Sequence, residues 1–134
     1  MERKYYIYSF EKLDVYKNAL AYSVQIRDIV TNFPKSEQFK LTSQIERSVD
    51  SIGSNLAEGS GRASNFDQAH FTNMAYGSAL ETINHLNLAR ALQYINEERY
   101  VQLRIDMDRI INQLNSLYKY QLNKKENLKN KLKE

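Results

Sequence analysis

The residues best suited to chemistry form a polar stripe between positions 44 and 62. They recur at intervals of three and four residues, which places them on one face of an α-helix. The stripe comprises Gln44, Arg47, Ser51, Asn55, Glu58 and Arg62. Beside an apolar core, such a stripe is either a solvent-exposed face or a packed hydrogen-bond network. We favour a structural network over a ligand-binding site.

The helix that follows supplies partners for this stripe. In an antiparallel hairpin centred near residues 62–63, position 47 lies level with position 78, so we predict an ion pair between Arg47 and Glu81, within one chain or between subunits. Gly77 and Ser78 would let the two helices approach closely there. Pairs of this kind usually fix the register of helices and need not stabilise the fold much. Ser78 and Glu81 therefore join the predicted structural polar network.

Patterns of catalytic or metal-binding residues are missing from the sequence. Glu81 and His85 are four residues apart, whereas a di-iron bundle requires Glu and His at a spacing of three. His70 is on the same helix, roughly 22 Å from His85 at 1.5 Å per residue, so the two cannot share a metal ion within one chain. The chain has no Cys, no Walker-type loop and no nucleophile elbow. We expect no enzyme, no catalytic residue, no metal, no cofactor and no small-molecule substrate.

Two glycines follow the polar stripe, in the run Gly59-Ser60-Gly61-Arg62. A glycine-rich loop before a helix can bind a phosphate at the N-terminus of that helix. The same glycines can end the preceding helix with a left-handed cap, and we favour this second interpretation.

The positive charge of the chain is concentrated at its C-terminal end. The formal net charge is +3, yet six lysines against two glutamates give +4 from residue 119 onward, so the preceding residues sum to −1. The six are Lys119, Lys124, Lys125, Lys129, Lys131 and Lys133. They form a candidate nucleic-acid-binding arm that contacts phosphates, with Tyr118 and Tyr120 available for stacking on bases. A solvated chain end that binds nothing is the alternative.

Apolar residues at steps of three and four predict four helices, at about residues 10–32, 36–58 and 65–94, with a fourth that starts near residue 97. The chain has only four Gly and one Pro, which favours long helices. We predict an all-α, antiparallel up-down-up-down four-helix bundle in a single domain. Residues 1–9 would form a tyrosine-rich extension, 10–120 the bundle and 121–134 a basic tail.

The sequence has no apolar stretch near the ~20 residues that a membrane span requires. Its N-terminus does not have the pattern of a secretory signal. We therefore expect a cytoplasmic protein without a membrane partner.

Apolar residues on more than one face of the helices, and the N-terminal run Tyr5-Tyr6-Ile7-Tyr8, exceed what four helices can cover. This surplus predicts a homo-oligomer. The alternative is that the N-terminal segment folds back over its own bundle.

The segment 44–62, together with shorter matches elsewhere in residues 10–94, resembles a known signature. Its pattern is similar to Q-I-x-R-x-x-x-S-I-x-x-N-[IL]-A-E-G-x-G-R, which is typical of the family of proteins encoded in intervening sequences of bacterial 23S rRNA genes. Two positions differ from the family, because Glu46 stands where a basic residue is usual and Gly53 where proline is usual.

The resemblance implies a four-helix bundle, a closed ring of five subunits in some members, and association with RNA or DNA. It also implies similarity in fold to accessory variability proteins of diversity-generating retroelements, which bind a reverse transcriptase. We therefore expect an oligomeric binding protein, a pentamer by resemblance, that associates with nucleic acid by electrostatic contacts. The alternative function is a scaffold or accessory subunit that docks a partner protein without touching nucleic acid.

Overall fold

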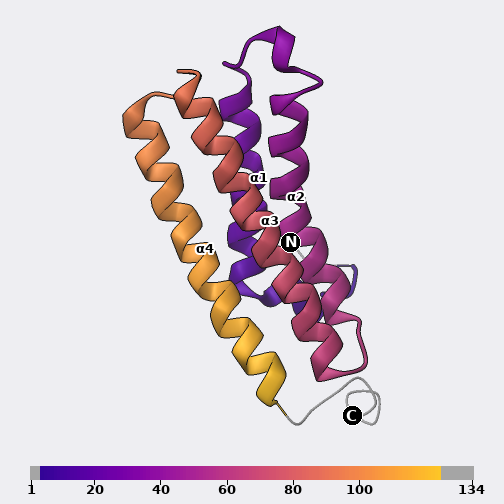
Figure 1. Ribbon diagram of the computed structural model, residues 1–134. Coiled ribbons are helices and arrows are strands. Elements are labelled where there is room, and N and C mark those ends of the chain that lie inside the picture. Colours follow the sequence, from indigo (N-terminus) through magenta and orange to yellow (C-terminus); the bar gives the residue numbers. More distant parts are fainter. Residues whose placement is uncertain (1–3, 125–134) are drawn as a thin grey trace.

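The structure, a computed structural model, describes residues 4–124. Its α-helices lie side by side and run alternately up and down (Figure 1). They are α1 (Asp14–Val30), α2 (Leu41–Ser60), α3 (Asn65–Ala91) and α4 (Glu97–Asn123). No strand occurs within residues 4–124. The predicted all-α, antiparallel four-helix bundle is confirmed.

The first two helices begin later than predicted. A short 3₁₀-helix, η1 (Ser9–Lys12), comes first, and the extended backbone of Leu13 (φ −69°, ψ 129°) separates it from α1. After Pro34 a second 3₁₀-helix, η2 (Lys35–Glu37), precedes α2, which starts at Leu41. Short 3₁₀ turns keep a spacing of apolar residues close to that of an α-helix, so periodicity alone does not reveal the break.

Polar residues cap the N-termini of the last two helices. Ser64 Oγ accepts a hydrogen bond from the Asp67 N–H at 3.0 Å, and Asn96 Oδ1 accepts one from the Arg99 N–H at 2.8 Å. Both satisfy backbone donors that a first helical turn leaves unpaired. α3 ends earlier than predicted, and beyond it Gln93 turns the chain with a left-handed φ of 63°.

Of the two glycines at the end of α2, Gly59 acts through its size. Gly61 has a right-handed φ of −88°, so the predicted left-handed cap is wrong. Gly59 is buried inside the helix, and a Cβ atom there would lie 2.7 Å from the Cβ of Phe71 on α3. The missing side chain at position 59 therefore lets the end of α2 touch the start of α3.

One apolar cluster runs along the bundle axis and draws on all four helices. Its largest fully buried apolar side chains are Tyr22, Ile26, Ile45, Ile52, Leu86, Leu103, Met107, Ile110 and Leu114. The buried Tyr22 hydroxyl donates to the Leu103 carbonyl at 2.7 Å, which satisfies the one polar atom of that side chain. No helix in the described part of the chain is long and apolar enough to span a membrane.

The helices do not pack equally closely. α2 and α3 share the most extensive contact, α4 packs on α3, and α1 touches α4 least. Two buried polar pairs lie at these contacts: Ser48 with Thr82 at 2.9 Å between α2 and α3, and Thr72 with Gln121 at 2.5 Å between α3 and α4. Because Gln121 is buried in this way, α4 extends to Asn123, past the predicted end of the bundle at residue 120.

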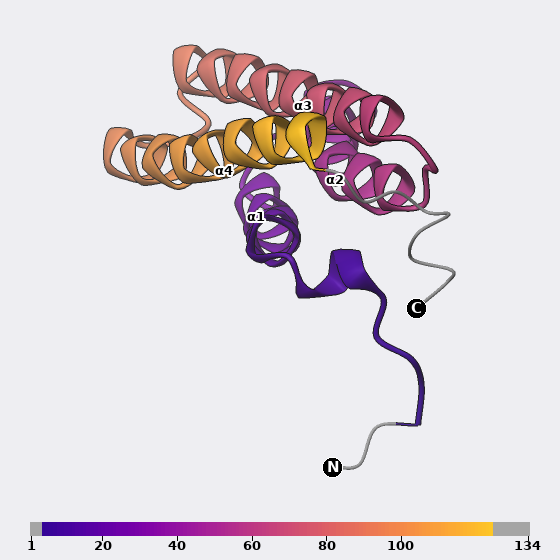
Figure 2. The ribbon, with the colours of Figure 1, turned by 90° about the horizontal axis from the view of Figure 1, so that it is seen from below.

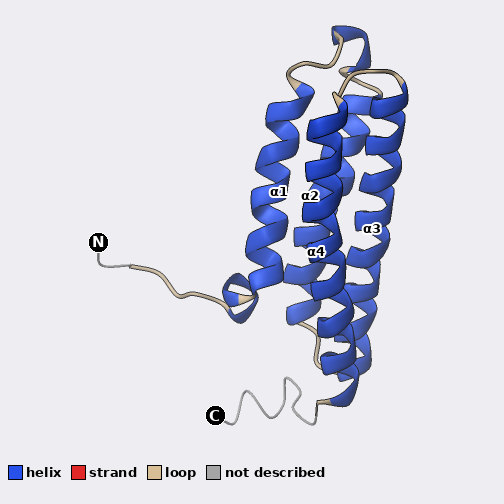
Figure 3. Ribbon diagram, turned by 90° about the vertical axis from the view of Figure 1, so that its left-hand side faces the viewer, coloured by secondary structure: helices blue, strands red, loops and turns tan. Residues whose placement is uncertain are grey.

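The N-terminal segment leaves the bundle at the start of α1 and points away from it (Figures 2 and 3). Tyr5, Tyr6 and Tyr8 remain 69%, 72% and 60% exposed. Residues 4–8, hereafter the N-terminal arm, thus do not fold back over their own bundle.

The contact of Gly59 with Phe71 predicts a matched pair of glycine substitutions. Gly59→Ala should lower the free energy of unfolding by about 1–3 kcal/mol, because the new Cβ overpacks the α2–α3 contact. Gly77→Ala should raise it by about 0.5–1 kcal/mol, since nothing lies within 4 Å of a Cβ there and Ala favours the helix. Urea unfolding followed by circular dichroism measures both, and equal effects would contradict the close approach at Gly59.

The buried hydroxyl of Tyr22 predicts a pH dependence of stability. Burial in the core, followed by the nearby Asp106 carboxylate, raises the pKa of this phenol above its usual value near 10. Above pH 10 the unfolded chain loses this proton first, so the free energy of unfolding falls as pH rises further. Tyr22→Phe should cost about 1 kcal/mol at neutral pH and should flatten the alkaline decline.

Denaturant unfolding between pH 7 and 11 tests this expectation, with exposed Tyr118→Phe as the matched control. The control should keep both the neutral stability and the alkaline decline of the wild type. An alkaline decline that is identical in Tyr22→Phe would show that other groups cause it.

Candidate functional site

The predicted polar stripe on α2 divides into an exposed part and a half-buried part. Gln44, Arg47, Glu58 and Arg62 are exposed, whereas Ser51 and Asn55 are half-buried. The stripe therefore does not form one continuous network.

Its half-buried centre is a short chain of hydrogen bonds between α2 and α3. Ser78 Oγ donates to Ser51 Oγ at 2.9 Å, and Asn55 Nδ2 donates to the same oxygen at 3.0 Å and to the Ser51 carbonyl at 2.9 Å. Small hydroxyl side chains thus fill the contact where a large residue would hold the helices apart. This part of the predicted network joins two helices and leaves no donor aimed at a ligand.

Within one chain, the predicted ion pair between Arg47 and Glu81 does not form in residues 4–124, and its formation between subunits stays a prediction. Arg47 is exposed, and Glu81 Oε1 lies 3.4 Å from Nε2 of His85 on its own helix. Ser51 faces Ser78 and Ser48 faces Thr82, so position 47 lies level with residues 82–83, close to Glu81 along the helix axis. The pair is absent because Arg47 lies on the exposed side of α2, one residue before the buried Ser48. Gly77 was also placed wrongly, since it faces outward from α3.

The last turn of α2 holds Arg62 in place. Its guanidinium lies 3.0 Å from Glu58 Oε1 and stacks 4.4 Å from the centroid of the Phe71 ring. Its carbonyl accepts a hydrogen bond from Gln68 Nε2 at 2.8 Å. Through these contacts the loop after α2 joins α2 to α3. This favours a structural role for Gly59 and Gly61 over phosphate binding.

The predicted basic residues lie at the C-terminal end of α4 or beyond it. Lys119 is exposed and pairs with no carboxylate of residues 4–124. Lys124 follows the helix, with its Nζ 5.8 Å from the centroid of the Tyr120 ring. The other four lysines, Lys125, Lys129, Lys131 and Lys133, lie outside the described residues.

Further cations share this end of the bundle. The antiparallel order brings the start of α1, the end of α2 and the end of α4 together there (Figure 1). Lys12, Lys17 and Arg62 belong to these segments and are exposed. The same end also carries the acids Glu11, Asp14, Glu58 and Asp67, so its net positive charge comes from the lysines of residues 119–134.

The two histidines lie in different surroundings. His85 is buried, and its Nε2 lacks a hydrogen-bond partner, with the Glu81 carboxylate 3.4 Å away. His70 is exposed and lies edge-on to Phe71, with ring centroids 5.8 Å apart. Within residues 4–124 no three His, Asp or Glu side chains gather closely enough to hold a metal ion.

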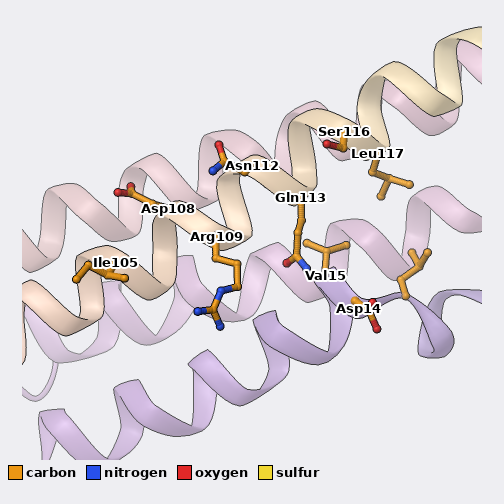
Figure 4. Close-up of a pocket in the computed structure, with 10 residues that line it drawn as sticks. Asp14, Val15, Ile105, Asp108, Arg109, Asn112, Gln113, Ser116 and Leu117 are labelled. Carbon is orange, nitrogen blue, oxygen red and sulfur yellow. The ribbon is translucent and has the colours of Figure 1, made fainter.

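The weak contact between α1 and α4 leaves an open groove of about 760 Å³. In Figure 4, Arg109 and Gln113 reach from α4 toward α1, whereas Asp108 points away. Gln113 accepts a hydrogen bond from Asn18 of α1 at 2.9 Å. The lining includes acids and an arginine but no histidine and no cysteine, so no nucleophile lies beside an imidazole base there.

An ion-pair cluster that sequence reasoning missed joins α1 to α2. Arg27 donates to both carboxylate oxygens of Asp50, at 2.8 and 2.6 Å, and its Nε lies 3.7 Å from Glu46. Hydrogen bonding to the guanidinium lowers the pKa of the Asp50 carboxyl. Glu46 could have pointed to this cluster, because it is an acid at a position where the family usually has a base. In the structure Glu46 faces Arg27 of the neighbouring helix.

Known proteins similar to this chain agree with its fold. The family model described as 23S rRNA-intervening sequence protein matches residues 11–116, which extends the resemblance into α4. A solved structure of a protein of unknown function, from the S23 ribosomal protein family of Bacteroides thetaiotaomicron, is 30% identical with a TM-score of 0.72. That match covers 78% of this chain and 95% of the other. No curated protein matches the chain. The chain belongs to the family of 23S rRNA-intervening sequence proteins.

Proposed function

We propose that this protein is a non-enzymatic, oligomeric binding protein of the cytoplasm that associates with RNA or other nucleic acid through contacts to phosphates. The observation that carries the proposal is the concentration of lysine from position 119 to the C-terminus. This segment contains six lysines and only two glutamates. Lysine ammonium groups bind phosphates as point charges and displace the counterions of a nucleic acid.

The arrangement of the bundle end supports this assignment. Lys119 is exposed on the last turns of α4, between Tyr118 and Tyr120, and both tyrosine rings reach solvent. Exposed aromatic rings beside lysine can stack on unpaired bases. Lys12 and Lys17 are exposed near the start of α1, at the same end of the bundle.

This chemistry recognises charge and not base sequence. Phosphate contacts position a protein on nucleic acid, whereas sequence is read by hydrogen bonds to base edges. We therefore propose binding with little sequence preference. In an oligomer, each further subunit adds the net charge of +4 of its residues 119–134 to the same complex, which raises the overall avidity.

A salt titration tests the proposal. Replacing Lys125, Lys129, Lys131 and Lys133 by Gln should weaken binding to a structured RNA, because it removes four phosphate contacts per chain. The slope of log K against log salt should become less steep by up to about 3–4 for duplex nucleic acid. Fluorescence anisotropy of a labelled RNA and of a random duplex DNA, with the full chain, measures both quantities.

The same four positions changed to Arg provide the control, since Arg keeps the charge and should keep the slope. Truncation is a cleaner variant if it starts after Lys124, because Gln121 is bonded to Thr72 inside the bundle. An unchanged slope in the Gln variant, or no binding at low salt, would overturn the proposal.

A partner protein is the second candidate, favoured by single exposed aromatic side chains at both ends of the bundle. Phe39 lies 87% exposed before α2, and Phe66 lies 74% exposed in the first turn of α3. A tagged chain that recovers one defined protein after nuclease treatment, and loses it on Phe39→Ser or Phe66→Ser, would favour this function over the first.

A further inference from the structure

Two uncovered apolar features of this chain fit each other. One is the N-terminal arm, residues 4–8, whose three tyrosines are at least 60% exposed. The other is a groove of about 580 Å³ between α1 and α2, hereafter the α1–α2 groove. Leu20 and Val24 on its α1 side are 54% and 65% exposed. Within one chain, nothing in residues 4–124 covers either feature.

The α1–α2 groove has the chemistry of a site for uncharged aromatic rings. Small residues of α2 form its floor, namely Gly53, Ser54 and Ala57. The two charged side chains that line it, Arg27 and Asp50, neutralise each other through paired hydrogen bonds. What remains is an apolar surface with serine hydroxyls at its edge, which suits the apolar ring and polar hydroxyl of a tyrosine.

The arm does not lie in the groove of its own chain (Figure 3). The Tyr8 N–H donates to the Glu11 carboxylate at 2.7 Å, which fixes the arm to η1. Phe10 then packs edge-on against Tyr16, with ring centroids 5.0 Å apart, and closes one end of the groove. Beyond this point the arm points away from α1 and α2 (Figure 3).

The lengths of the two features agree. An extended arm of five residues spans about 17 Å at 3.3 Å per residue. The groove follows α1 from Tyr16 to Arg27, which is also about 17 Å at a rise of 1.5 Å per residue. Three tyrosines that become covered would bury about 400–500 Å² and the groove a similar area, for a total of about 800–1,000 Å², at the lower bound of roughly 1,000 Å² for a specific interface.

We propose that the N-terminal arm of one chain docks in the α1–α2 groove of a second copy of this chain. This inference rests on the oligomeric part of the proposed function. Each chain has one arm and one groove, so two chains can exchange arms mutually, or each arm can dock in the next chain in a head-to-tail contact. Repeated contacts of this type close into a ring when the rotation between neighbours permits it.

Cysteine cross-linking tests the docking directly, because the natural chain has no Cys. Tyr6→Cys and Val24→Cys change exposed positions, so both variants should fold. When the two single variants are mixed and treated with a short bis-maleimide, cross-linked dimers should form between arm and groove. Tyr6→Cys mixed with Val101→Cys is the matched control, since Val101 is similarly exposed on α4 but lies outside the groove, and it should give at least about tenfold less product.

Light scattering of the full chain gives an independent readout. The wild type should have a discrete mass that is a multiple of 15.7 kDa. Val24→Glu, or Ser at positions 5, 6 and 8, should weaken self-association at least about tenfold, whereas Val101→Glu should leave the mass unchanged. A wild-type monomer, or an oligomer without arm-to-groove cross-links, would overturn the inference.

The outcomes separate this inference from nucleic-acid binding. Cross-linked oligomers that show no salt-dependent binding of RNA or DNA would support arm docking and overturn the phosphate contacts. A monomer that binds RNA with a steep salt slope would support the phosphate contacts and overturn arm docking.

Discussion

The close contact of α2 with α3 is the constraint on which the rest of the bundle depends. At one end Gly59 brings α2 against Phe71, and further along Ser48 meets Thr82 through buried hydroxyls. Hydroxyls are tolerated in a core only when they are paired, since an unpaired buried donor or acceptor costs about 1–3 kcal/mol. The two helices therefore fit in one register, and a shift would leave these groups without partners.

This contact determines where the other helices can lie. With α2 on one side of α3, α4 packs on another, held at its end by the bond from Thr72 to Gln121. α1 then reaches α4 only through a few contacts, among them Tyr22 to the Leu103 carbonyl. The groove between α1 and α4, and the exposed side of α1 that bears Leu20 and Val24, both follow from this arrangement.

The parts of the fold that depend on local sequence could be predicted. The number and order of the helices follow from the spacing of apolar residues. Ser64 and Asn96 mark the starts of α3 and α4, and each could be recognised because an N-cap involves residues only three apart. The pairing of Arg47 with Glu81 within one chain was predicted wrongly, because sequence spacing did not show which side of α2 faces α3. Ser48 and Ser51 occupy that side, and Arg47 is exposed.

For contacts between residues far apart in the sequence, one residue stood out but its partner could not be identified. Glu46 stood out as an acid at a usually basic position, but only the packing of α1 on α2 shows that Arg27 faces it. Gly53 stood out in the same way. A Cβ atom there would lie 3.6 Å from the Tyr16 ring, so the glycine helps to shape the floor of the α1–α2 groove.

The proposed arm docking and the proposed phosphate binding involve the same end of the molecule. Ser9 and Phe10 of η1, directly after the arm, line a pocket together with Tyr120 and Lys124 at the end of α4. When two chains hold their corresponding ends close together, an arm of about 17 Å reaches the Tyr16 end of a neighbouring groove. Such an assembly gathers the lysines of several chains on one rim, where their mutual repulsion opposes assembly and a polyanion relieves it. Nucleic acid and oligomer would then stabilise each other by linkage, each binding more tightly when the other is present.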